Sequence, residues 1–412
     1  MNYELFIAKR IIAGKEYKNS ISAPIIKIAI IAIALGITVM LIATATTTGL
    51  QHKIRNKISG FKGHIQITNF DNNNSGISLV PISKNQYFFP TIPNVDGIKK
   101  VQVFATRAGL IKTATDFEGI IFKGVSKSYD WTFFKEYLIA GDLPDYNQRR
   151  VKDVLLSKTF VDNLQLKLND TITATFFKDK KNSLPSVRKY HIKGIYDTGF
   201  LEFDKTVMIG DIKEVQRLNK WRVNEEVGGF EVILEDFNQI EEKSKTIYKE
   251  IPVTLNAISI VEAYPAIFEW IALFDNNVWF IIVMMILVAG INMITALLVL
   301  ILERVQMVGI LKSLGSSDTS IRKIFLYNAS YLILKGLFFG NLIGLTVLFI
   351  QKYTGFITLN PETYYVSSVP VYMSFWNILF LNSGTLILCF LMLLIPSYVI
   401  TKIQPSKSIR FA

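Results

Sequence analysis

Few side chains in this sequence have the types and spacing that metal binding or nucleophilic catalysis requires. The three histidines are His52, His64 and His191, and no two of them stand at the short spacing of a metal-binding motif. No serine lies in a G-x-S-x-G or comparable nucleophile setting. The sequence therefore predicts neither a metal site nor a hydrolase-type catalytic triad.

Phosphate and acid–base chemistry are equally poorly supported. Gly14-Lys15 is followed by Glu16 and lacks the earlier glycine of a phosphate-binding loop, so the chain does not bind ATP through a P-loop of its own. Glu225 and Glu226 are adjacent in sequence, which is typical of a solvated turn rather than of a paired general acid and base. We expect no enzyme activity in this chain and no cofactor bound by it.

The segment LERVQMVGILKSLGSSDTSIRKIF, residues 302–325, has a composition that suits binding to a protein. Its apolar positions recur at the spacing of a short helix and are Val305, Val308, Ile310, Leu311 and Leu314. Gly315 is the expected C-cap, and Ser317 or Asp318 can cap the helix that follows. The pattern predicts a helix partly embedded in a partner's groove; the alternative is a helix that rests on the membrane surface.

The sequence contains four apolar runs that are long enough to cross a bilayer, which takes about 20 residues of helix. Half of all residues are hydrophobic, and the mean hydropathy is +0.33. Buried helices of a soluble protein would show a polar face more often than these runs do. The chain is therefore predicted to be a multi-pass membrane protein with four transmembrane helices.

The basic residues predict which side of the membrane each segment occupies. Lys and Arg gather before the first span, between the second and third spans and after the fourth, and such clusters mark the cytoplasmic side. Both termini are therefore expected inside, and residues 51–270 outside. That long segment holds 31 Lys and Arg against 27 Asp and Glu, so most of the net charge of +12 is a topology signal. We expect no nucleic-acid partner.

The predicted fold class is an α-helical membrane domain of four transmembrane helices plus a large α+β extracytoplasmic (periplasmic) domain inserted between helices 1 and 2. Strands are expected over 64–68, 99–113, 118–126, 170–177, 188–199 and 228–236, and helices over 154–166 and 237–251. The single cysteine, Cys389, lies in the fourth span, so the outer domain is held by its own core without a disulfide.

The expected order of segments follows from these patterns. It is a cytoplasmic amphipathic helix over 1–22, spans over 23–50, 271–302, 321–351 and 375–401, a periplasmic domain with stalks over 51–270, a cytoplasmic coupling helix and loop over 303–320, a short periplasmic loop over 352–374 and a cytoplasmic tail over 402–412. The first span is preceded by more than twenty residues and is span-length, which argues against a cleaved signal peptide.

Small residues in the third span predict close helix packing. Gly336, Gly340 and Gly344 are spaced by four, so they share one helix face and let a neighbouring helix approach. Lys335 lies in the same span and must find a partner or a water-filled space, but the sequence gives no role for it.

Several stretches resemble a known family. Residues 292–325 resemble the segment of type VII ABC-transporter permeases, an FtsX-like and MacB-like superfamily, that runs from the second span into the coupling helix. The C-terminal IQPSKSIRFA is similar to the closing motif of that family. LFIAKRII, the first span and PETYYVSSVPVYMS (361–374) are similar to lipoprotein-releasing permeases, whereas the outer domain matches more loosely, chiefly in HIKGIYDTGFLEFDKTVMI.

This resemblance implies a function and a set of partners. The chain would be the permease subunit of an ABC transporter in the bacterial inner membrane, working with a separate ATPase that binds ATP and Mg²⁺ and with a second permease, either the same chain or a homologue. The complex would extract lipoproteins from the outer leaflet and pass them to a periplasmic carrier. Motion of the ATPase would enter through residues 303–315, with contacts expected at Glu303, Arg304, Met307, Val308, Ile310, Leu311, Lys312, Leu314 and Gly315.

The resemblance also implies an apolar, collapsible cavity for the lipid anchor. Its walls would come from the first and second spans and their outer extensions, at Ile54, Ile58, Phe61, Ile267, Phe268, Ile271 and Phe274. The basic loop before the HIKGIYDTG strand stands where some members dock their carrier, which makes Lys178, Lys180, Lys181, Leu184 and Pro185 candidate docking residues.

One further function in the same superfamily, one from another class and a membrane sensor stay open at this point. The chain could export peptides or drugs together with an outer-membrane channel, or it could regulate a cell-wall hydrolase through its stalk. A membrane sensor without an ATPase would leave the segment at 303–315 without a purpose. The outer loop PETYYVSSVP favours lipoprotein release over export, and the large outer domain argues against the hydrolase regulator.

Overall fold

The computed structural model describes residues 3–13, 22–70, 77–113, 116–147, 151–177 and 184–403, and it contains two compact units. The first unit, here the helical unit, comprises residues 1–52, 270–358 and 368–412. The second, here the outer unit, comprises residues 53–269 and 359–367. Two long helices, α2 (Ser22–Lys62) and α9 (Pro265–Glu303), belong to both units.

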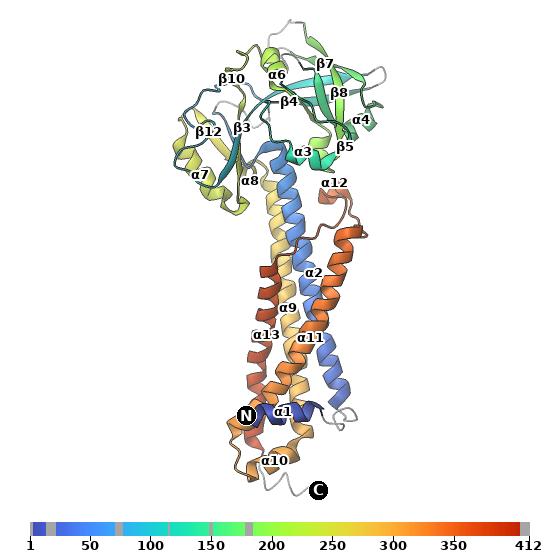
Figure 1. The fold of residues 1–412 in the computed structure, drawn as a ribbon, viewed down its shortest axis with the longest axis vertical. Helices are drawn as coiled ribbons and strands as arrows, with labels where there is room; N and C mark the ends of the chain where they lie inside the picture. Colours follow the sequence, from blue (N-terminus) through green and yellow to red (C-terminus); the bar gives the residue numbers. More distant parts are fainter. Residues whose placement is uncertain are drawn as a thin grey trace. The chain divides into compact units, whose positions relative to one another are not determined.

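The helical unit consists of a bundle of long apolar helices and short helices at one end of that bundle (Figure 1). Its further elements are α1 (Tyr3–Ala13), α10 (Val305–Ser313), α11 (Asp318–Thr354), α13 (Phe375–Ser397) and the 3-10 helix η3 (Tyr398–Lys402). Among the described residues, four helices are long and apolar enough to cross a membrane. The fold class predicted from hydropathy is therefore confirmed.

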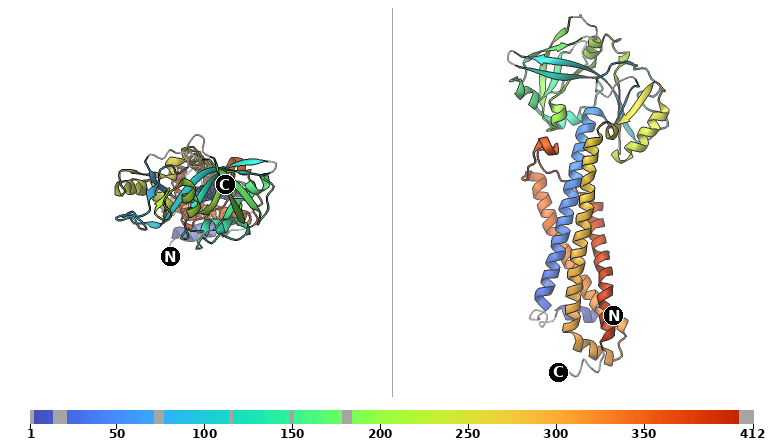
Figure 2. Two further views of the ribbon diagram at one scale, coloured as in Figure 1. Left: turned by 90° about the horizontal axis from the view of Figure 1, so that it is seen from above. Right: turned by 180° about the vertical axis from the view of Figure 1, so that it is seen from behind.

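Apolar side chains and a few polar bonds hold this bundle together. Ile37 and Met293 are fully buried in its core. Gln51 Nε2 of α2 donates to Asp275 Oδ1 of α9 over 2.8 Å, and α2 and α9 lie side by side in both ribbon views (Figures 1 and 2). Asn341 of α11 exchanges hydrogen bonds with an asparagine of α13, because amides in hydrocarbon need a partner.

The short helix α1 packs across one end of the bundle. Its Ala8 is buried, and the Ser320 hydroxyl of α11 donates to Glu4 Oε1 over 2.7 Å. Leu5 and Phe6 stay exposed on its other side. The sequence predicts an amphipathic helix over residues 1–22; α1 accounts for residues 3–13, and residues 14–21 lie outside the described part.

The outer unit is built on a mixed β-sheet with helices on its surface. Its elements are β1 (Ile65–Asn69), β2 (Ile82–Ser83), β3 (Ile98–Lys112), β4 (Phe117–Val125), α3 (Thr132–Tyr137), β5 (Leu138–Gly141), β6 (Asp153–Ser157), α4 (Lys158–Asn163), β7 (Thr171–Phe176), β8 (Ser186–Tyr196), α5 (Leu201–Asp204), β9 (Val207–Asp211), α6 (Ile212–Asn219), β10 (Glu226–Val227), β11 (Gly229–Leu234), η2 (Phe237–Gln239), α7 (Ile240–Glu250), β12 (Leu255–Ser259), α8 (Ile260–Ala263) and α12 (Pro361–Tyr364).

The strand order gives the outer unit two halves that share β3. The order is β12-β1-β11-β3-β4-β9-β6-β8-β5, and β7 pairs with both β3 and β8. The neighbours β3, β4, β9, β6, β8 and β7 therefore return to β3 and form a closed ring of strands. Phe122, Phe176 and Tyr190 are buried together in this half, with ring centroids 5.1 to 6.4 Å apart.

The predicted strands of the outer domain are present, with one correction. Residues 154–166 were expected to form a helix, but the structure has β6 up to Ser157 and only then α4. The fully buried run Val154, Leu155 and Leu156 pairs with β8, and a short apolar run cannot be told from a buried helix by periodicity alone. Ser157 caps α4 by accepting from the backbone N–H of Phe160, which sets the boundary.

Candidate functional site

The candidate coupling helix α10 is closed at its end by a Schellman motif. The N–H of Ser316 bonds to the carbonyl of Leu311, and the N–H of Gly315 bonds to the carbonyl of Lys312, both over 3.0 Å. Gly315 has φ +91°, a conformation that favours glycine, and it stands one position after the C-cap. Of the two candidates for capping α11, the structure uses Ser317, whose hydroxyl accepts from the N–H of Ser320.

Two faces of α10 differ in exposure. Val308 and Gly309 are buried in the bundle, and Met307 and Leu311 are partly buried against it. The exposed side chains recur at helical spacing along one stripe, here the outward stripe, which consists of Gln306, Ile310, Ser313 and Leu314. Ile310 is 48% exposed and Leu314 78%.

Most of the nine predicted coupling residues do not belong to that stripe, and Arg304 and Lys312 are among those that do not. Arg304 is partly buried as the residue that precedes α10. Lys312 turns inward: its ammonium donates to the carbonyls of Ile400 and Ile403 and pairs with Asp318. The coupling roles of the segment stay a prediction, but only part of it is available to touch another protein.

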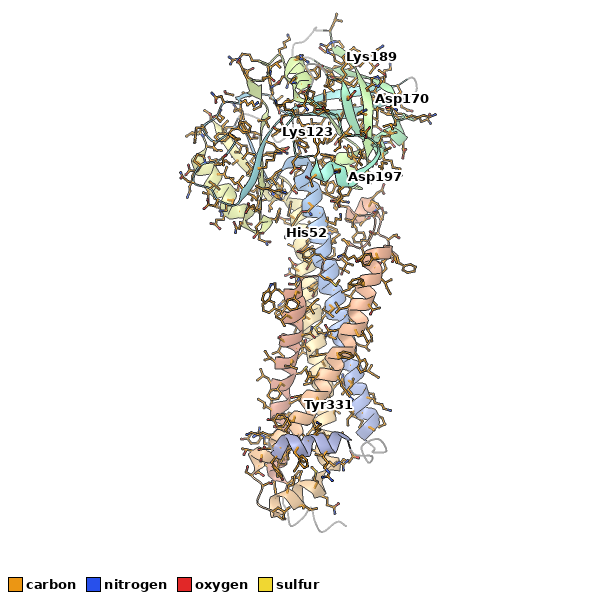
Figure 3. All side chains as sticks on the ribbon, viewed as in Figure 1. His52, Lys123, Asp170, Lys189, Asp197 and Tyr331 are labelled. Atoms are coloured by element: carbon orange, nitrogen blue, oxygen red, sulfur yellow. The ribbon has the colours of Figure 1, made fainter. Side chains whose placement is uncertain are left out.

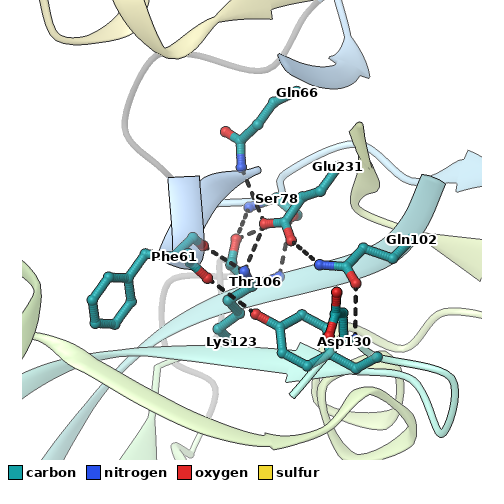
Figure 4. A network of polar contacts seen from close by, with 10 residues as sticks. Phe61, Gln66, Ser78, Gln102, Thr106, Lys123, Asp130 and Glu231 are labelled. Atoms are coloured by element: carbon teal, nitrogen blue, oxygen red, sulfur yellow. Dashed lines mark hydrogen bonds and ion pairs between the residues drawn. The ribbon is translucent and has the colours of Figure 1, made fainter. Parts of the chain in front are cut away.

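The outer end of α2 is held in the outer unit by a buried polar network (Figure 4). Lys123 Nζ forms an ion pair of 2.6 Å with Glu231 and also donates to the carbonyl of Phe61. The Tyr129 hydroxyl donates to the carbonyl of Gly60 over 3.3 Å. Two of the last carbonyls of the helix thus receive donors from β4 and from the segment after it.

Burial makes this network strong and costly to disturb. The side chains of Lys123 and Glu231 are 5% and 1% exposed, and Gln102 Nε2 donates to the second oxygen of Glu231 over 3.1 Å. Burial raises the pKa of Tyr129 well above its usual value, so its phenol remains a neutral donor. Removing one member of a buried ion pair costs about 3–5 kcal/mol in proteins.

The side chains proposed to line a lipid cavity are mostly buried within this single chain. Ile54, Ile58 and Phe61 of α2 are at most 1% exposed, and Phe61 lies among four aromatic rings at centroid distances of 4.7 to 6.0 Å. Ile267 and Ile271 of α9 are also buried. Exposing any of these five to an acyl chain would require the helices to separate from their present neighbours.

The remaining two residues of that predicted cavity, Phe268 and Phe274, are less enclosed. Phe268 is partly buried and stacks on Phe237 at 6.0 Å, whereas Phe274 packs edge-on against Trp270 at 5.0 Å. The cavity assignment of all seven residues stays a prediction.

The predicted docking loop is described only at its end. Lys178, Lys180 and Lys181 lie outside the described residues. Leu184 is 83% exposed and Pro185 is exposed directly before β8. The side chains that can be placed are therefore accessible to a partner, and the docking role stays a prediction.

Three glycines of α11 face α2 in the helical unit. A Cβ on Gly336 would meet Ile33 at 2.7 Å, and one on Gly340 would meet Ile37 at 1.7 Å. The hydroxyl of Thr38 donates to the carbonyl of Gly340 over 3.0 Å. Lys335 of the same helix is exposed, and its ammonium lies 4.7 Å from the ring centroid of Tyr331, which Figure 3 labels.

A contact that the sequence did not reveal joins the predicted short outer loop to the outer unit. Lys57 Nζ donates to the carbonyl of Tyr365 over 2.8 Å, and the ring of Tyr365 stacks on Phe200 at 4.9 Å. Tyr365 has φ +58° and follows α12. Lys57 in the apolar stalk and Tyr364-Tyr365 in the loop are visible in the sequence, but no pattern in the sequence predicts that they are in contact.

The described residues contain no group of three or more His, Cys, Asp or Glu side chains that could hold a metal ion. The side chains that the structure gathers instead are an exposed apolar stripe at α10 and a buried joint at the end of α2.

Two protein-family models match the sequence. The MacB-like periplasmic core domain matches residues 28–247, more than half of the chain, and the FtsX-like permease C-terminal model matches residues 279–405. Together the matches cover most of the first span, most of the outer unit and the chain from residue 279, within α9, through η3.

Curated relatives match over nearly the whole chain. The lipoprotein-releasing system transmembrane protein LolC of Neisseria meningitidis is 21% identical over 99% of both chains. The corresponding protein LolE of Haemophilus influenzae is also 21% identical over 99% of both chains. LolC of Buchnera aphidicola is 24% identical over 93% of this chain and 92% of its own.

Solved structures match the outer unit at low similarity. The periplasmic region of MacB from Actinobacillus actinomycetemcomitans is 14% identical, with a TM-score of 0.33 over 49% of this chain and 94% of that one. The extracellular domain of the ABC-type transporter YknZ from Gram-positive bacteria is 13% identical, with a TM-score of 0.32 over 47% of this chain and 99% of that one.

Proposed function

The chain belongs to the family of permeases that carry a MacB-like periplasmic core domain and an FtsX-like C-terminal region, and from that premise we propose that it is the permease subunit of a lipoprotein-releasing ABC transporter. The observation that carries the proposal is the similarity to LolC and LolE over 99% of both chains. It includes the spans, the inner segment and the outer unit at once, so it is not a match to a single widespread domain.

The chemistry of the cargo explains why an external energy source is needed. Exposing a lipid anchor to water costs about 0.8 kcal/mol for each CH₂ group, so a lipoprotein with several acyl chains does not leave a membrane unaided. The sequence has no P-loop, and a separate ATPase subunit that binds ATP and Mg²⁺ would supply the work. The lipoprotein would then pass to a periplasmic carrier, and a second permease would complete the membrane part.

The outward stripe of α10 is the surface on which the ATPase would act. It presents Ile310 and Leu314 exposed, while Val308 on the opposite side is buried in the bundle. A helix in this arrangement can receive a partner on one face and move the bundle through the other. The helices α2 and α9 continue from the helical unit into the outer unit, so they would carry that movement onward.

A reconstituted complex tests both the partner and the cargo. The chain is purified in mild detergent with its co-purifying ATPase and placed in vesicles that contain a triacylated protein, with and without the carrier fraction. We expect ATP-dependent release of the acylated protein and no ATP hydrolysis by the permease alone. Steady ATP hydrolysis without release of any acylated protein would reject the proposed cargo.

A double variant tests the coupling surface. Ile310→Asp with Leu314→Asp places two charges on the outward stripe, and we expect both ATPase binding and release to fall at least tenfold. Val253→Asp is the matched control, because Val253 is 96% exposed and lies in the loop between α7 and β12. Full activity of the double variant would show that the ATPase acts elsewhere.

A further inference from the structure

We propose that Lys312 is a positioning residue that fastens α10 to both neighbouring spans, so that a push on the outward stripe reaches the ends of α11 and α13 together. The inference rests on the proposed function for the origin of the push. The fastening itself is a property of the described contacts.

The ammonium group of Lys312 connects α10 with the end of η3 and with the start of α11. Lys312 Nζ donates to the carbonyls of Ile400 and Ile403, each over 2.9 Å, and lies 3.5 Å from the carbonyl of Thr401. It also forms an ion pair of 2.8 Å with Asp318. The side chain is 11% exposed, so these bonds form largely out of water.

The acceptors match what a lysine can satisfy. An ammonium has three donors, and the last carbonyls of a helix have no intrahelical partner and carry partial negative charge. The carbonyls of Ile400 and Ile403 lie at the end of η3, which ends at Lys402, and that of Ile400 also accepts the N–H of Ile403 over 3.3 Å. Asp318 stands in the first turn of α11, where a carboxylate is favoured. Lys312 thus links the end of one span to the start of another.

Lys312 lies on the side of α10 opposite to the outward stripe. Lys312 lies between Ile310 and Leu314 in sequence but points to the other side of the helix, where Val308 is also buried. Ile310 and Leu314 therefore stay exposed on the outward stripe while Lys312 holds the opposite face.

A separate contact keeps α11 and α13 together when Lys312 is changed. Arg322 Nε donates to the Ser397 hydroxyl over 3.1 Å, and its guanidinium lies 4.6 Å from the ring centroid of Tyr398. Replacing Lys312 therefore loosens α10 from the two spans without separating the spans from each other. This makes the link testable by itself.

The first experiment measures coupling in the reconstituted complex. Lys312→Met keeps the length of the side chain and removes the charge and the donors. We expect normal amounts of co-purifying ATPase and continued ATP hydrolysis, with at least tenfold less acylated protein released per ATP.

Lys312→Arg should recover most of the release, and Asp318→Asn should lower it less than Lys312→Met because the carbonyl bonds remain. Lys323→Met, an exposed lysine of α11, is the matched control.

The second experiment measures the link without any ATPase or cargo. Spin labels at Gln306→Cys and Lys402→Cys, in a Cys389→Ala background, report the distance between α10 and the end of η3 in the full chain. We expect a narrow distribution with Lys312 or Arg and a broad one with Met.

An unchanged distribution, or an equal loss of ATP hydrolysis and release in Lys312→Met, would overturn the proposal. A wild-type complex that fails to release lipoprotein would instead reject the proposed function, and the distance measurement would still decide the role of Lys312.

Discussion

At the scale of single residues, two groups of the outer unit titrate with opposite effects on stability. Asp204 is fully buried; burial raises its pKa to about 6, although the Thr198 hydroxyl donates to it over 2.7 Å. His64 accepts the backbone N–H of Leu234 at Nδ1 over 2.8 Å, and burial, aided by Lys99, lowers its pKa to about 4. In the folded state Asp204 thus favours its protonated form, whereas His64 favours its unprotonated form.

The direction of each effect follows from proton linkage. The folded chain holds a proton on Asp204 up to about pH 6, above the ordinary value of 3.8, so the contribution of Asp204 to stability is lost as pH rises from 4 to 6. The unfolded chain protonates His64 below pH 6.5 and the folded chain only below about 4, so the contribution of His64 is lost as pH falls through that window. Each is on the order of 3 kcal/mol.

We therefore predict that these contributions oppose each other in the wild-type chain between pH 4 and 6.5. Asp204→Asn removes the contribution of Asp204 and keeps that of His64, so the stability of this variant should rise with pH across this window. His64→Asn, whose amide oxygen can replace Nδ1 as the acceptor, should make stability fall with rising pH. Thermal unfolding of the full chain in detergent, followed by fluorescence at several pH values, measures both slopes. Parallel pH profiles for the two variants would contradict the assignment.

Residue types were easier to predict than the directions of side chains. The sequence predicted a coupling segment and included Lys312, Ile310 and Leu314 in one set. Only the packed structure separates them, because the acceptors of Lys312 lie almost ninety residues further along the chain at Ile400 and Ile403. The same reason explains why the contact between Lys57 and Tyr365 was missed.

At the scale of secondary-structure elements, the glycines of α11 determine how closely α2 can approach. A Cβ on Gly340 would meet Ile37 at 1.7 Å and the carbonyl oxygen of Ala34 at 2.7 Å, so the helices themselves would have to separate. A Cβ on Gly344 would meet its nearest atom, of Leu41, at 3.2 Å, which a small shift can relieve. Close approach of this kind is the main source of packing between helices in a membrane.

We predict that Gly340→Ala lowers the unfolding temperature of the bundle and that Gly344→Ala lowers it less. Gly384→Ala in α13 is the matched control, because no atom lies within 4 Å of its added Cβ and alanine is the better helix former by about 1 kcal/mol. Thermal unfolding of the three variants in one detergent gives the order. A Gly340→Ala variant as stable as the control would show that α2 and α11 do not pack through this glycine.

Periodicity predicted long elements well and short ones less well. In the spans and in the long strand β3 one pattern repeats over many residues, so periodicity predicts the correct type of secondary structure there. Residues 154–157 offered four apolar or small positions in front of a helix, and their pairing with β8 made them a strand. Long-range pairing of this kind is not encoded in a local window.

At the scale of the whole molecule, two helices are longer than a membrane requires. The 41 residues of α2 and the 39 residues of α9 correspond to about 60 Å of helix each, about twice the thickness of the hydrocarbon layer. Both pass from the helical unit into the outer unit without a break. Under the proposed function, movement imposed on one unit would reach the other through this continuous backbone.

This use of the helices requires that α10 and the outer unit lie on opposite sides of the membrane, which the distribution of Lys and Arg predicts. Cysteines at Lys402 and Val253, both exposed, test the arrangement in a Cys389→Ala background. In spheroplasts, a membrane-impermeant maleimide should label Val253→Cys at once and Lys402→Cys only after permeabilisation. Labelling of both before permeabilisation, or of Lys402→Cys alone, would place the inner segment outside the reach of a cytoplasmic ATPase, and the coupling mechanism would have to be abandoned.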